Sequence, residues 1–293
     1  MKKILIIGQG FLGSSFQKIA VKNDFSTFGT YHTKSIPNCI SLDISNIDDV
    51  EKIVKQLNPD FIINFASQND LDFLESHPEL AMNVNCIGAS NIAQIANETK
   101  VKMLHISTDS VFDGTRGNYS ENDIPNPINV YAKSKYEGEL NVLKKSKNSI
   151  IARTNFYGIN NEEKYFLNWV LRQLKNNIPM TGYTDVIFSP LNTVNLSHML
   201  LELLQTSFTG IIHLSSNNSF SKYDFISKII SSLNLSHSLV IPGNIPLDNF
   251  KAKRPKNTSL SNKLASNILK TKTIEFNDWL VENKSNIMRI IQT

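Results

Sequence analysis

A tyrosine and a lysine four residues apart form the pair in this sequence best suited to acid–base chemistry. Tyr131 and Lys135 belong to the segment Tyr-Ala-Lys-Ser-Lys, and on a helix this spacing places both side chains on one face. A tyrosine with its ordinary pKa of about 10 transfers protons poorly at neutral pH. A neighbouring ammonium group would stabilise the phenolate, lower the tyrosine pKa and make proton transfer to a carbonyl group feasible.

Hydroxyl side chains upstream of this pair could complete a catalytic site. Ser107 and Thr108 end an apolar run, and Thr108 comes 23 residues before Tyr131. A hydroxyl at a strand end can hydrogen-bond a substrate carbonyl while a tyrosine delivers the proton. A nicotinamide cofactor would supply the hydride, with the protein providing orientation and the proton. Thr108, Tyr131 and Lys135 are therefore the candidate catalytic residues.

A glycine-rich segment near the N-terminus is typical of dinucleotide binding. Gly8-Gln9-Gly10-Phe11-Leu12-Gly13 follows the apolar run 3–7 directly and opens an amphipathic stretch. The first glycine permits a tight turn, the second lets the backbone approach a pyrophosphate, and the third lets the helix pack closely on the strand. The pyrophosphate then lies at the helix N-terminus. The alternative is a glycine turn that binds no nucleotide. The candidate cofactor residues here are Gly8, Gly10, Phe11, Leu12 and Gly13.

The end of the second apolar run bears on the choice of nicotinamide cofactor. An NAD-specific site commonly has Asp or Glu there to bond the ribose 2′-hydroxyl, but no acidic residue occurs between Phe25 and Ile40. His32, Thr33 and Lys34 stand in this place and could receive a 2′-phosphate. We therefore expect NADP(H) to be preferred, with NAD(H) as an option.

Two further strand ends could line the same cleft. Asp43, followed by Ile44, ends the third run, and its carboxylate could accept a hydrogen bond from an adenine amino group. An equally good interpretation is that Asp43 forms a helix cap with Ser45 and Asn46. The fourth run ends in Phe65-Ala66-Ser67, which would leave room for the ribose and nicotinamide.

Short apolar runs separated by amphipathic stretches must position these residues. Strands that are apolar on both faces belong to a parallel sheet covered by helices. Their alternation with helical patterns predicts a Rossmann-type, doubly wound α/β fold. The predicted strands span 3–7, 26–31, 38–42, 61–64, 102–107, 149–153 and 210–214, and the predicted helices include 12–21, 47–57, 78–98 and 131–145.

The regular alternation ends after about residue 155, which indicates a second part of the chain. We expect residues 1–154 to form the NAD(P)-binding domain. Residues 155–293 would form a smaller substrate-binding lobe over the strand ends, with segments near 187–214 returning to the first domain.

Composition excludes several other classes of function. The net charge is +4 over 293 residues, and no aromatics interleave with the basic groups as in a nucleic-acid surface. Cys39 and Cys86 support neither a disulfide framework nor a zinc site, and no metal is expected. No segment approaches the roughly 20 apolar residues of a membrane span. We therefore expect a cytoplasmic protein that binds neither nucleic acid nor membrane.

These motifs together resemble the dTDP-4-dehydrorhamnose reductase family of extended short-chain dehydrogenases. The resemblance runs nearly end to end, and its most diagnostic parts are Ser-Thr-Asp-Ser-Val-Phe-Asp-Gly at 107–114 and the late Arg254-Pro255. It implies a reductase that delivers hydride to C4 of a dTDP-4-keto-6-deoxyhexose, in deoxysugar biosynthesis for a cell-surface polysaccharide. Thr108 would polarise the ketone, Tyr131 would donate the proton, and Lys135 would hold the nicotinamide ribose.

The resemblance also implies where a nucleotide-sugar substrate would bind. Arg153 matches a position near the substrate nucleotide, and Ser110 stands where the family usually has Tyr on the rim of the sugar pocket. A homodimer is one option for the oligomeric state, which the sequence leaves open. The expected substrate-binding residues are Ser107, Thr108, Asp109, Ser110, Arg153, Asn155, Ser189 and Arg254.

Other functions share this fold. A sugar-nucleotide 4,6-dehydratase normally has Thr-Asp-Glu where this chain has Thr108-Asp109-Ser110, so the glutamate is missing. A C4 epimerase lacks a clear signature here and would hold NAD tightly. Relatives of these reductases also serve as nucleotide-binding regulatory subunits of methionine adenosyltransferase, a role that would not need an intact Thr, Tyr and Lys set.

Overall fold

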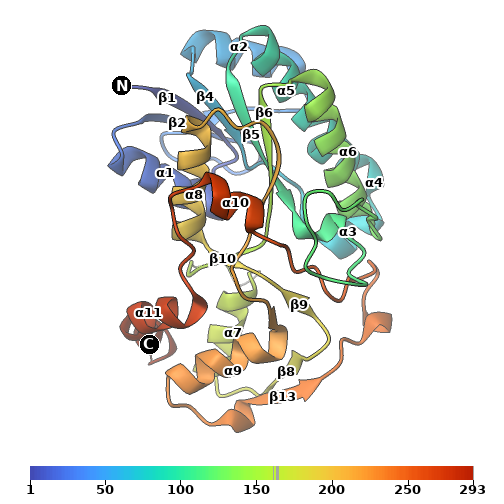
Figure 1. Cartoon of the computed structure of the whole chain (residues 1–293), viewed down its shortest axis with the longest axis vertical. Coiled ribbons are helices and arrows are strands. Elements are labelled where there is room, and N and C mark those ends of the chain that lie inside the picture. The colour runs from blue at the N-terminus through green and yellow to red at the C-terminus, as the bar shows by residue number, and fades with distance from the viewer. Residues whose placement is uncertain (161, 163–164, 293) are drawn as a thin grey trace.

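A seven-stranded parallel sheet forms the larger part of the computed structural model, which describes residues 1–160, 162 and 165–292 (Figure 1). The strand order is β11-β6-β5-β4-β1-β2-β3. The strands are β1 (Lys3–Ile7), β2 (Ser26–Tyr31), β3 (Ile40–Ser41), β4 (Phe61–Asn64), β5 (Lys102–Thr108), β6 (Ser149–Thr154) and β11 (Gly210–Leu214). The predicted strands are confirmed, with β3 shorter than the apolar run that indicated it.

The order of the strands is that of a doubly wound, Rossmann-type fold. From β1 the chain moves outward to β2 and β3, and then crosses to β4, β5, β6 and β11 on the other side. In such sheets a ligand binds outside the carboxyl ends of the strands, where the direction of winding reverses. That position lies between the ends of β1 and β4, which are neighbours in register from Ile4–Phe61 to Ile7–Asn64.

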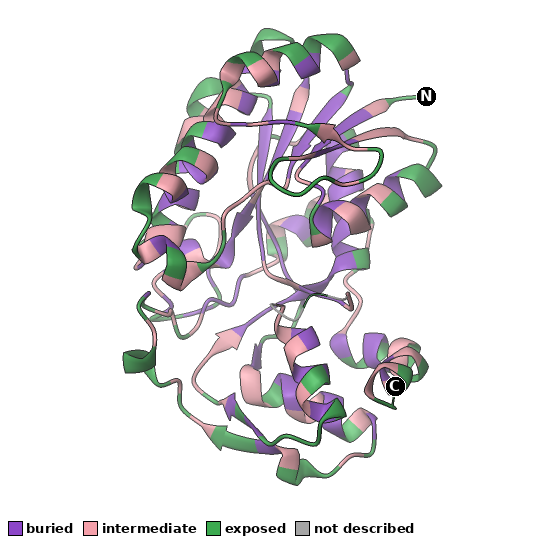
Figure 2. Ribbon diagram, turned by 180° about the vertical axis from the view of Figure 1, so that it is seen from behind, coloured by how far each residue is buried: buried purple, intermediate pink, exposed green. Residues whose placement is uncertain are grey.

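Helices cover both faces of the sheet because each strand is apolar on both sides. Ile4 and Ile6 pack into a core with one set of helices, whereas Leu5 and Ile7 pack into a second core with another set. The first set is α1 (Phe11–Lys22), α8 (Thr193–Gln205) and α10 (Lys263–Ile268), and the second is α2 (Ile47–Leu57), α5 (Ala89–Glu98) and α6 (Val130–Lys145). In Figure 2 the strands are mostly buried, and the outward faces of the helices are exposed.

The helix predicted over 78–98 is interrupted. After α3 (Leu71–Glu75), the chain forms a short α4 (Pro78–Ala81), a π-helical segment η1 (Met82–Gly88) and only then α5. The buried Asn85 occupies the π-helical segment. Its side-chain Nδ2 donates to Ser134 Oγ of α6 at 2.9 Å and to the carbonyl of Gln68 at 2.9 Å. The segment also packs against α6 at Gly138, where an added Cβ would lie 2.3 Å from the Asn85 carbonyl oxygen.

The smaller lobe has its own aromatic core. Phe225 and Phe276 stack with ring centroids 4.1 Å apart, and Tyr157 meets both rings edge-on. In Figure 1 the lobe lies below the carboxyl ends of the sheet strands. Its elements are β7 (Phe156–Tyr157), α7 (Phe166–Lys175), β8 (Met180–Tyr183), β9 (Ile187–Phe188), β12 (Phe220–Ser221), α9 (Lys222–Ser232), β13 (Val240–Gly243) and α11 (Phe276–Gln292).

The chain passes between the two parts more than once. β10 (Leu191–Asn192) pairs with β7 at the junction, after which α8 and β11 return to the large sheet. β9 stays in the lobe, where it pairs with β12. The segment that returns thus begins at about residue 191 rather than 187. Within the described residues, no helix is long and apolar enough to span a bilayer, and no group of His, Cys, Asp or Glu is placed to hold a metal ion.

Candidate active site

A cleft of about 600 Å³ lies between the sheet and the lobe, at the carboxyl ends of β1, β4, β5 and β6. It extends from the glycine loop to the first turn of α6, and α7 of the lobe closes one side through Phe166. The predicted site residues that line it are Gly8, Gly10, Phe11, Leu12, Gly13, Phe65, Ala66, Ser67, Ser107, Thr108, Asp109, Ser110, Tyr131, Lys135 and Asn155.

The glycine loop is shaped to admit a ligand at the N-terminus of α1. Gly8 has φ +90°, and an added Cβ would lie 2.6 Å from the Ala66 amide nitrogen. A Cβ at Gly13 would lie 2.3 Å from the Gly8 carbonyl oxygen, so this glycine allows the close helix–strand contact. Gly10 is the N-cap of α1, no side chain caps the helix, and an added Cβ would meet nothing within 4 Å. The free N–H groups at this terminus suit an anion.

The residues expected to contact the adenosine lie outside the cleft itself. Backbone Gln9 N–H donates to the Thr30 carbonyl at 2.9 Å, so the glycine loop lies beside the end of β2. His32, Thr33 and Lys34 follow at this same sheet edge, and Lys34 is exposed. Their position is compatible with a 2′-phosphate site next to the cleft.

Asp43 forms a turn with Ser45 before α2, but it is not the residue that caps the helix. Its Oδ1 accepts hydrogen bonds from the backbone N–H and the hydroxyl of Ser45, which lower the pKa of the carboxyl. The N-cap of α2 is Asn46, and His32 Nε2 lies 3.8 Å from the other Asp43 oxygen. Ile44 was expected to contact the cofactor. Its side chain is instead buried in the core against Gly88, so this expectation is wrong for the side chain.

The start of α6 places Tyr131 and Lys135 in the cleft. Asn129 caps the helix by accepting from Ala132 N–H at 2.8 Å, and its own amide donates to the Lys253 carbonyl at 2.9 Å. The capped first turn therefore directs Tyr131 at the cleft. Lys135, one turn later, is 1% exposed.

The pKa of Tyr131 differs from the sequence-based expectation. Burial raises it to about 12, while hydrogen bonding with Thr108 and Ser67 acts in the opposite direction. Lys135 does not lower this pKa here, because its side-chain nitrogen Nζ donates to the Ile106 carbonyl at 2.7 Å and lies 3.3 Å from His105 Nε2. Burial in turn lowers the pKa of Lys135 to about 8. The phenol is thus protonated at neutral pH, and it lines the same cleft as the strand-end hydroxyl of Thr108.

Comparisons with known proteins agree with this arrangement. A family model described as the RmlD substrate binding domain matches residues 1–287. A dTDP-4-dehydrorhamnose reductase of Aggregatibacter actinomycetemcomitans is 33% identical over 95% of this chain and 96% of its own. This chain belongs to the dTDP-4-dehydrorhamnose reductase family. The crystal structure of the Bacillus anthracis dTDP-4-dehydrorhamnose reductase in complex with NADP has a TM-score of 0.84 and 29% identity, and the match covers 100% of both chains.

The same comparisons include a subunit of a different enzyme. Methionine adenosyltransferase 2 subunit beta of Danio rerio is 27% identical over 88% of this chain and 82% of its own. The reductase family and this subunit therefore share the fold over most of their length.

Asp109 connects the catalytic strand end of this family member to its lobe. The carboxylate is buried and accepts hydrogen bonds from Thr258 Oγ1 at 2.7 Å and Asn155 Nδ2 at 2.9 Å. Burial raises its pKa, and these bonds counteract the increase. Next to it, Ser110 N–H donates to Thr108 Oγ1 at 3.1 Å. Thr108 Oγ1 donates to Asp109 Oδ1 at 3.2 Å, so Asp109 ties the end of β5 to the segments that hold Asn155 and Thr258.

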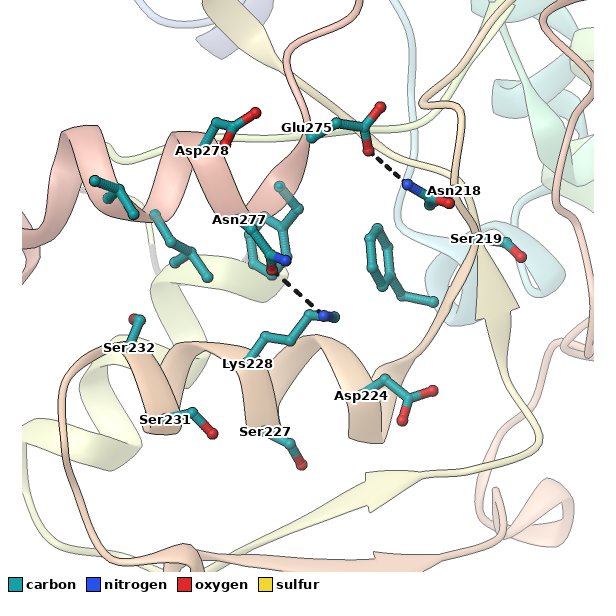
Figure 3. Close-up of a pocket in the computed structure, with 14 residues that line it drawn as sticks. Asn218, Ser219, Asp224, Ser227, Lys228, Ser231, Ser232, Glu275, Asn277 and Asp278 are labelled. Carbon is teal, nitrogen blue, oxygen red and sulfur yellow. Dashed lines mark hydrogen bonds between the residues drawn. The ribbon is translucent and has the colours of Figure 1, made fainter.

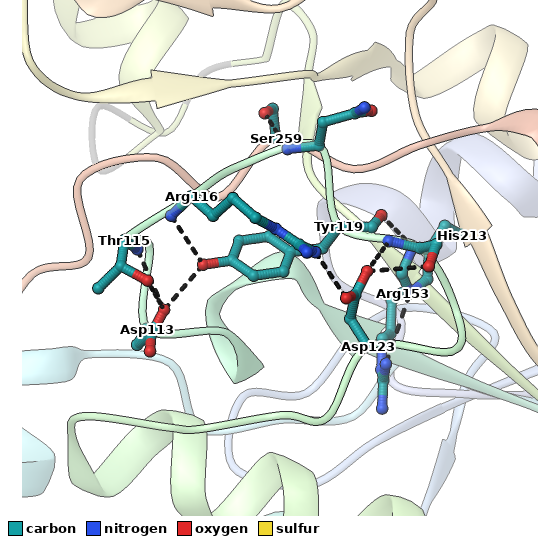
Figure 4. A network of polar contacts seen from close by, with 10 residues as sticks. Asp113, Thr115, Arg116, Tyr119, Asp123, Arg153, His213 and Ser259 are labelled. Carbon is teal, nitrogen blue, oxygen red and sulfur yellow. Dashed lines mark hydrogen bonds and ion pairs between the residues drawn. The ribbon is translucent and has the colours of Figure 1, made fainter.

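The position of Arg153 contradicts the expectation, drawn from the family resemblance, that it binds the substrate. Its side chain is 1% exposed, and its guanidinium binds Glu139 with Nη2–Oε2 at 2.6 Å. The guanidinium carbon also lies 5.2 Å from the ring centroid of Phe112, and Arg153 Nη1 lies 3.4 Å from His213 Nε2. Figure 4 shows Arg153 beside His213, within the polar network around Tyr119. With no part of it lining the cleft, Arg153 is placed to support the strand end rather than to bind substrate.

Ser189 and Arg254 also lie outside the cleft. The Ser189 hydroxyl accepts a hydrogen bond from Leu260 N–H at 2.9 Å and is buried. Arg254 Nη2 lies 2.7 Å from Asp72 Oδ2, and its guanidinium packs over Phe250. Both side chains thus hold the segment 250–260 against the rest of the protein. The expectation that they contact the substrate directly is therefore wrong in this structure, because neither lines the cleft.

Sequence reasoning missed several lobe residues. Lys222, at the start of α9, lies with Nζ 4.0 Å from the ring centroid of Phe166 and 3.4 Å from that of Phe188. Burial lowers its pKa to about 7, against the opposing effect of the Asp109 charge. No acceptor for its Nζ is found among residues 1–160, 162 and 165–292. Lys222 itself does not line the cleft, whereas Asn69, Leu71, Ile106, Thr154, Phe156, Tyr165 and Phe166 do and were also missed.

A second hollow, of about 1080 Å³, lies in the lobe between α9 and α11 (Figure 3). Its polar side chains bond one another: Lys228 reaches Asn277 at 3.3 Å, and Asn218 reaches Glu275 at 2.6 Å. None of the predicted site residues lines this hollow. We therefore assign the chemistry to the cleft above the sheet.

Proposed function

We propose that this protein is an NADP(H)-preferring reductase of a nucleotide-linked 4-keto-6-deoxysugar, of which dTDP-4-dehydrorhamnose is the first candidate. The observation that carries the proposal is that a single cleft contains both an open glycine loop and the Thr108–Tyr131 hydroxyl pair. The family and the intact Thr, Tyr and Lys set support it as well.

The residues present suit a dinucleotide cofactor. The open space at Gly10 and the uncapped N-terminus of α1 would receive the pyrophosphate. The backbone of 65–67 and the side chains of Tyr131 and Lys135 would surround the ribose and nicotinamide, and His32, Thr33 and Lys34 would face the 2′-phosphate. When bound, the nicotinamide supplies the hydride.

The protein's own contribution is to orient the ketone and deliver a proton. Thr108 would donate a hydrogen bond to the carbonyl oxygen, and Tyr131 would protonate the oxygen as hydride reaches the carbon. The raised pKa of Tyr131, about 12, keeps the phenol protonated at neutral pH, which is the state that reduction requires. A positioned acid of this kind typically accelerates a reaction by about 10²–10⁴-fold.

Substrate recognition falls to residues around Asp109. Asn155 and Ser110 line the cleft beside Thr108 and would contact the sugar. Lys222 takes the role that Arg153 was expected to have, as the cation for the diphosphate of the nucleotide. It packs over Phe166, which lines the cleft, and its charge acts on Asp109. The ring of Phe166 keeps the ammonium group away from bulk water.

The proposal is tested by following NADPH oxidation with a panel of nucleotide-linked 4-keto sugars and identifying the reduced sugar. Stoichiometric loss of NADPH with formation of a 4-hydroxy sugar is expected. A dehydratase or an epimerase returns the hydride to the sugar, so it would show no net oxidation. No oxidation with any keto sugar, together with specific binding to a methionine adenosyltransferase, would contradict the proposal and favour the regulatory role.

A further inference from the structure

A buried chain of hydrogen bonds leads from β4 to the active-site lysine. Ala66 backbone N–H donates to Asn64 Oδ1 at 3.0 Å. A backbone N–H can only donate, so this contact fixes which end of the Asn64 amide is the oxygen. The amide nitrogen Nδ2 therefore faces His105 Nδ1, at 3.0 Å, and donates to it.

This contact determines the tautomer of His105. Nδ1 accepts a hydrogen bond and so carries the lone pair, which leaves the proton of the neutral ring on Nε2. The ring is 0% exposed, and burial together with the nearby Lys135 keeps its pKa well below the ordinary value. His105 therefore stays neutral, with an Nε2–H group directed at Lys135 Nζ, 3.3 Å away.

Lys135 Nζ then has one donor and one acceptor as neighbours. The acceptor is the Ile106 carbonyl at 2.7 Å, and the donor is His105 Nε2–H. A neutral amine satisfies both, because it has N–H groups to donate and one lone pair to accept. An ammonium group has only N–H donors, so one of them would face the N–H of His105.

We propose that the contacts of Lys135 favour its neutral amine form in the cofactor-free protein, so that at mildly alkaline pH the side chain takes up a proton when NADPH binds. The cofactor would bring several phosphate charges and ribose hydroxyl acceptors, both of which favour an ammonium group. The inference rests on the proposed cofactor site. Burial acts in the same direction, since it lowers the pKa of the free protein's Lys135 to about 8.

No other titratable group around α6 takes the place of His105 beside Lys135 Nζ. Glu139 raises the pKa of Lys135, but its carboxylate is bound by Arg153 and by the Ser107 hydroxyl. The titratable or charged groups on the elements packed against α6 are Lys102 and His105 on β5, Arg153 on β6, Asp109 in η2 (Asp109–Val111), Asp72 and Glu75 in α3, Glu79 in α4, Cys86 in η1 and Glu98 in α5. Helix α6 itself carries Tyr131, Lys133, Tyr136, Glu137, Glu139, Lys144 and Lys145 besides Lys135. Of these, His105 is the one that contacts Nζ.

The uptake concerns the charge beside the cofactor rather than Tyr131. In the free protein Tyr131 has a pKa of about 12 and gains nothing from Lys135, whose Nζ is bound to the Ile106 carbonyl. The added proton would place a positive charge next to the ribose and phosphates of the bound cofactor.

Calorimetry measures the proton directly. NADPH is titrated into the full-length protein in buffers of different ionisation enthalpy at pH 7, 8 and 9. With a free pKa of about 8, the uptake should be small at pH 7 and should rise toward one proton at pH 9. The 2′-phosphate, with a second pKa of about 6, is ionised before and after binding at pH 8 and 9 and adds nothing.

Two variants test whether Lys135 is the group that takes up the proton and whether His105 controls the uptake. Lys135→Met keeps the length of the side chain and should reduce the uptake to zero. His105→Phe keeps a ring but removes Nε2–H, and should move the midpoint of the uptake to higher pH. An unmoved midpoint, or a histidine nitrogen NMR spectrum that places the His105 proton on Nδ1, would overturn the part played by His105.

The wild-type protein alone gives an independent check. By linkage, the slope of log Kd for NADPH against pH must equal the measured uptake, so binding should weaken by up to tenfold per pH unit above pH 8. Tight binding without proton uptake at pH 9, or uptake that persists in Lys135→Met, would overturn the inference and leave the proposed function intact. Absence of NADPH binding at every pH would instead contradict the proposed function.

Discussion

Glu139 and Arg153 form a buried ion pair behind the end of β5, and each side chain is only 1% exposed. Arg153 Nε also lies 3.0 Å from Glu139 Oε1, and Ser107 donates its hydroxyl to the same carboxylate. The pair therefore holds Ser107, and with it the adjacent Thr108, in place. It explains why Arg153 is unavailable to a substrate.

Removing one partner of this pair should be strongly destabilising. Arg153→Met leaves the Glu139 carboxylate buried and unpaired, which typically costs about 3–5 kcal/mol of unfolding free energy. Denaturant unfolding measures the change. Arg116→Met is the matched control, because Arg116 pairs with Asp123 but is 60% exposed, and its effect should be far smaller. Equal effects for the two variants would contradict the structural role assigned to Arg153.

Thr108→Val should slow the reaction without affecting the cofactor. The valine has the same shape but cannot donate to the ketone oxygen or bond the Tyr131 phenol. We expect turnover to fall by about 10–100-fold, or roughly 1.4–2.7 kcal/mol of barrier. The Kd of NADPH should be unchanged. Thr184→Val, at an exposed threonine outside the cleft, is the matched control, and a Thr108→Val enzyme as active as that control would remove Thr108 from the mechanism.

The absence of an acidic residue at the end of β2 predicts a preference for NADPH. NADPH should bind at least as well as NADH, and Lys34→Ala should weaken NADPH binding while leaving NADH binding unchanged. Lys22→Ala, at the far end of α1, serves as the control for a lost surface charge. Side-by-side titrations decide the matter. A preference of tenfold or more for NADH, about 1.4 kcal/mol, would show that Lys34 has no such role.

If Lys222 binds the substrate diphosphate, the KM for the substrate should depend on pH. Burial depresses its pKa to about 7, so the side chain is charged below that pH and loses its proton as the pH rises through it. The KM for an anionic nucleotide sugar should therefore increase from pH 6.5 to 8.5. Lys222→Met should have a high KM throughout this range and lack the increase, with little change in NADPH binding.

The matched control for this change is Lys228→Met, on the outer part of the same helix, where Lys228 bonds Asn277. It should behave as wild type. A Lys222→Met enzyme whose KM and pH profile match those of Lys228→Met would exclude Lys222 from substrate binding.

The sheet and the glycine loop could be predicted because their signals are local. Leu5 and Ile6 are adjacent apolar residues whose side chains point to opposite faces of the sheet. Gly8 and Gly13 occupy positions where only a glycine fits. The interruption at Met82–Gly88 could not be predicted, because it depends on Asn85 finding partners in α6 and in the loop at Gln68. A polar residue in an otherwise helical pattern gives no sign of such contacts.

The substrate end was less predictable for a similar reason. Arg153 and Lys222 are both cations in family motifs, and their roles depend on which side chains enclose them. Arg153 meets Glu139, 14 positions earlier in the chain, whereas Lys222 meets aromatic rings from α7 and β9. The pKa of Tyr131 likewise depends on enclosure by the lobe and on the contact between Lys135 and His105, which helical spacing does not reveal.

Tyr131→Phe is the most direct test of the proposed chemistry. The ring is retained, but the group that protonates the new alkoxide is lost, so turnover on a confirmed keto sugar should fall by about 10²–10⁴-fold, or roughly 3–5 kcal/mol of barrier. NADPH binding should change little. Tyr136→Phe, on the same helix and packed near Phe112, should retain wild-type turnover. If Tyr131→Phe turns over within about threefold of wild type, Tyr131 is not the proton donor and the mechanism is wrong.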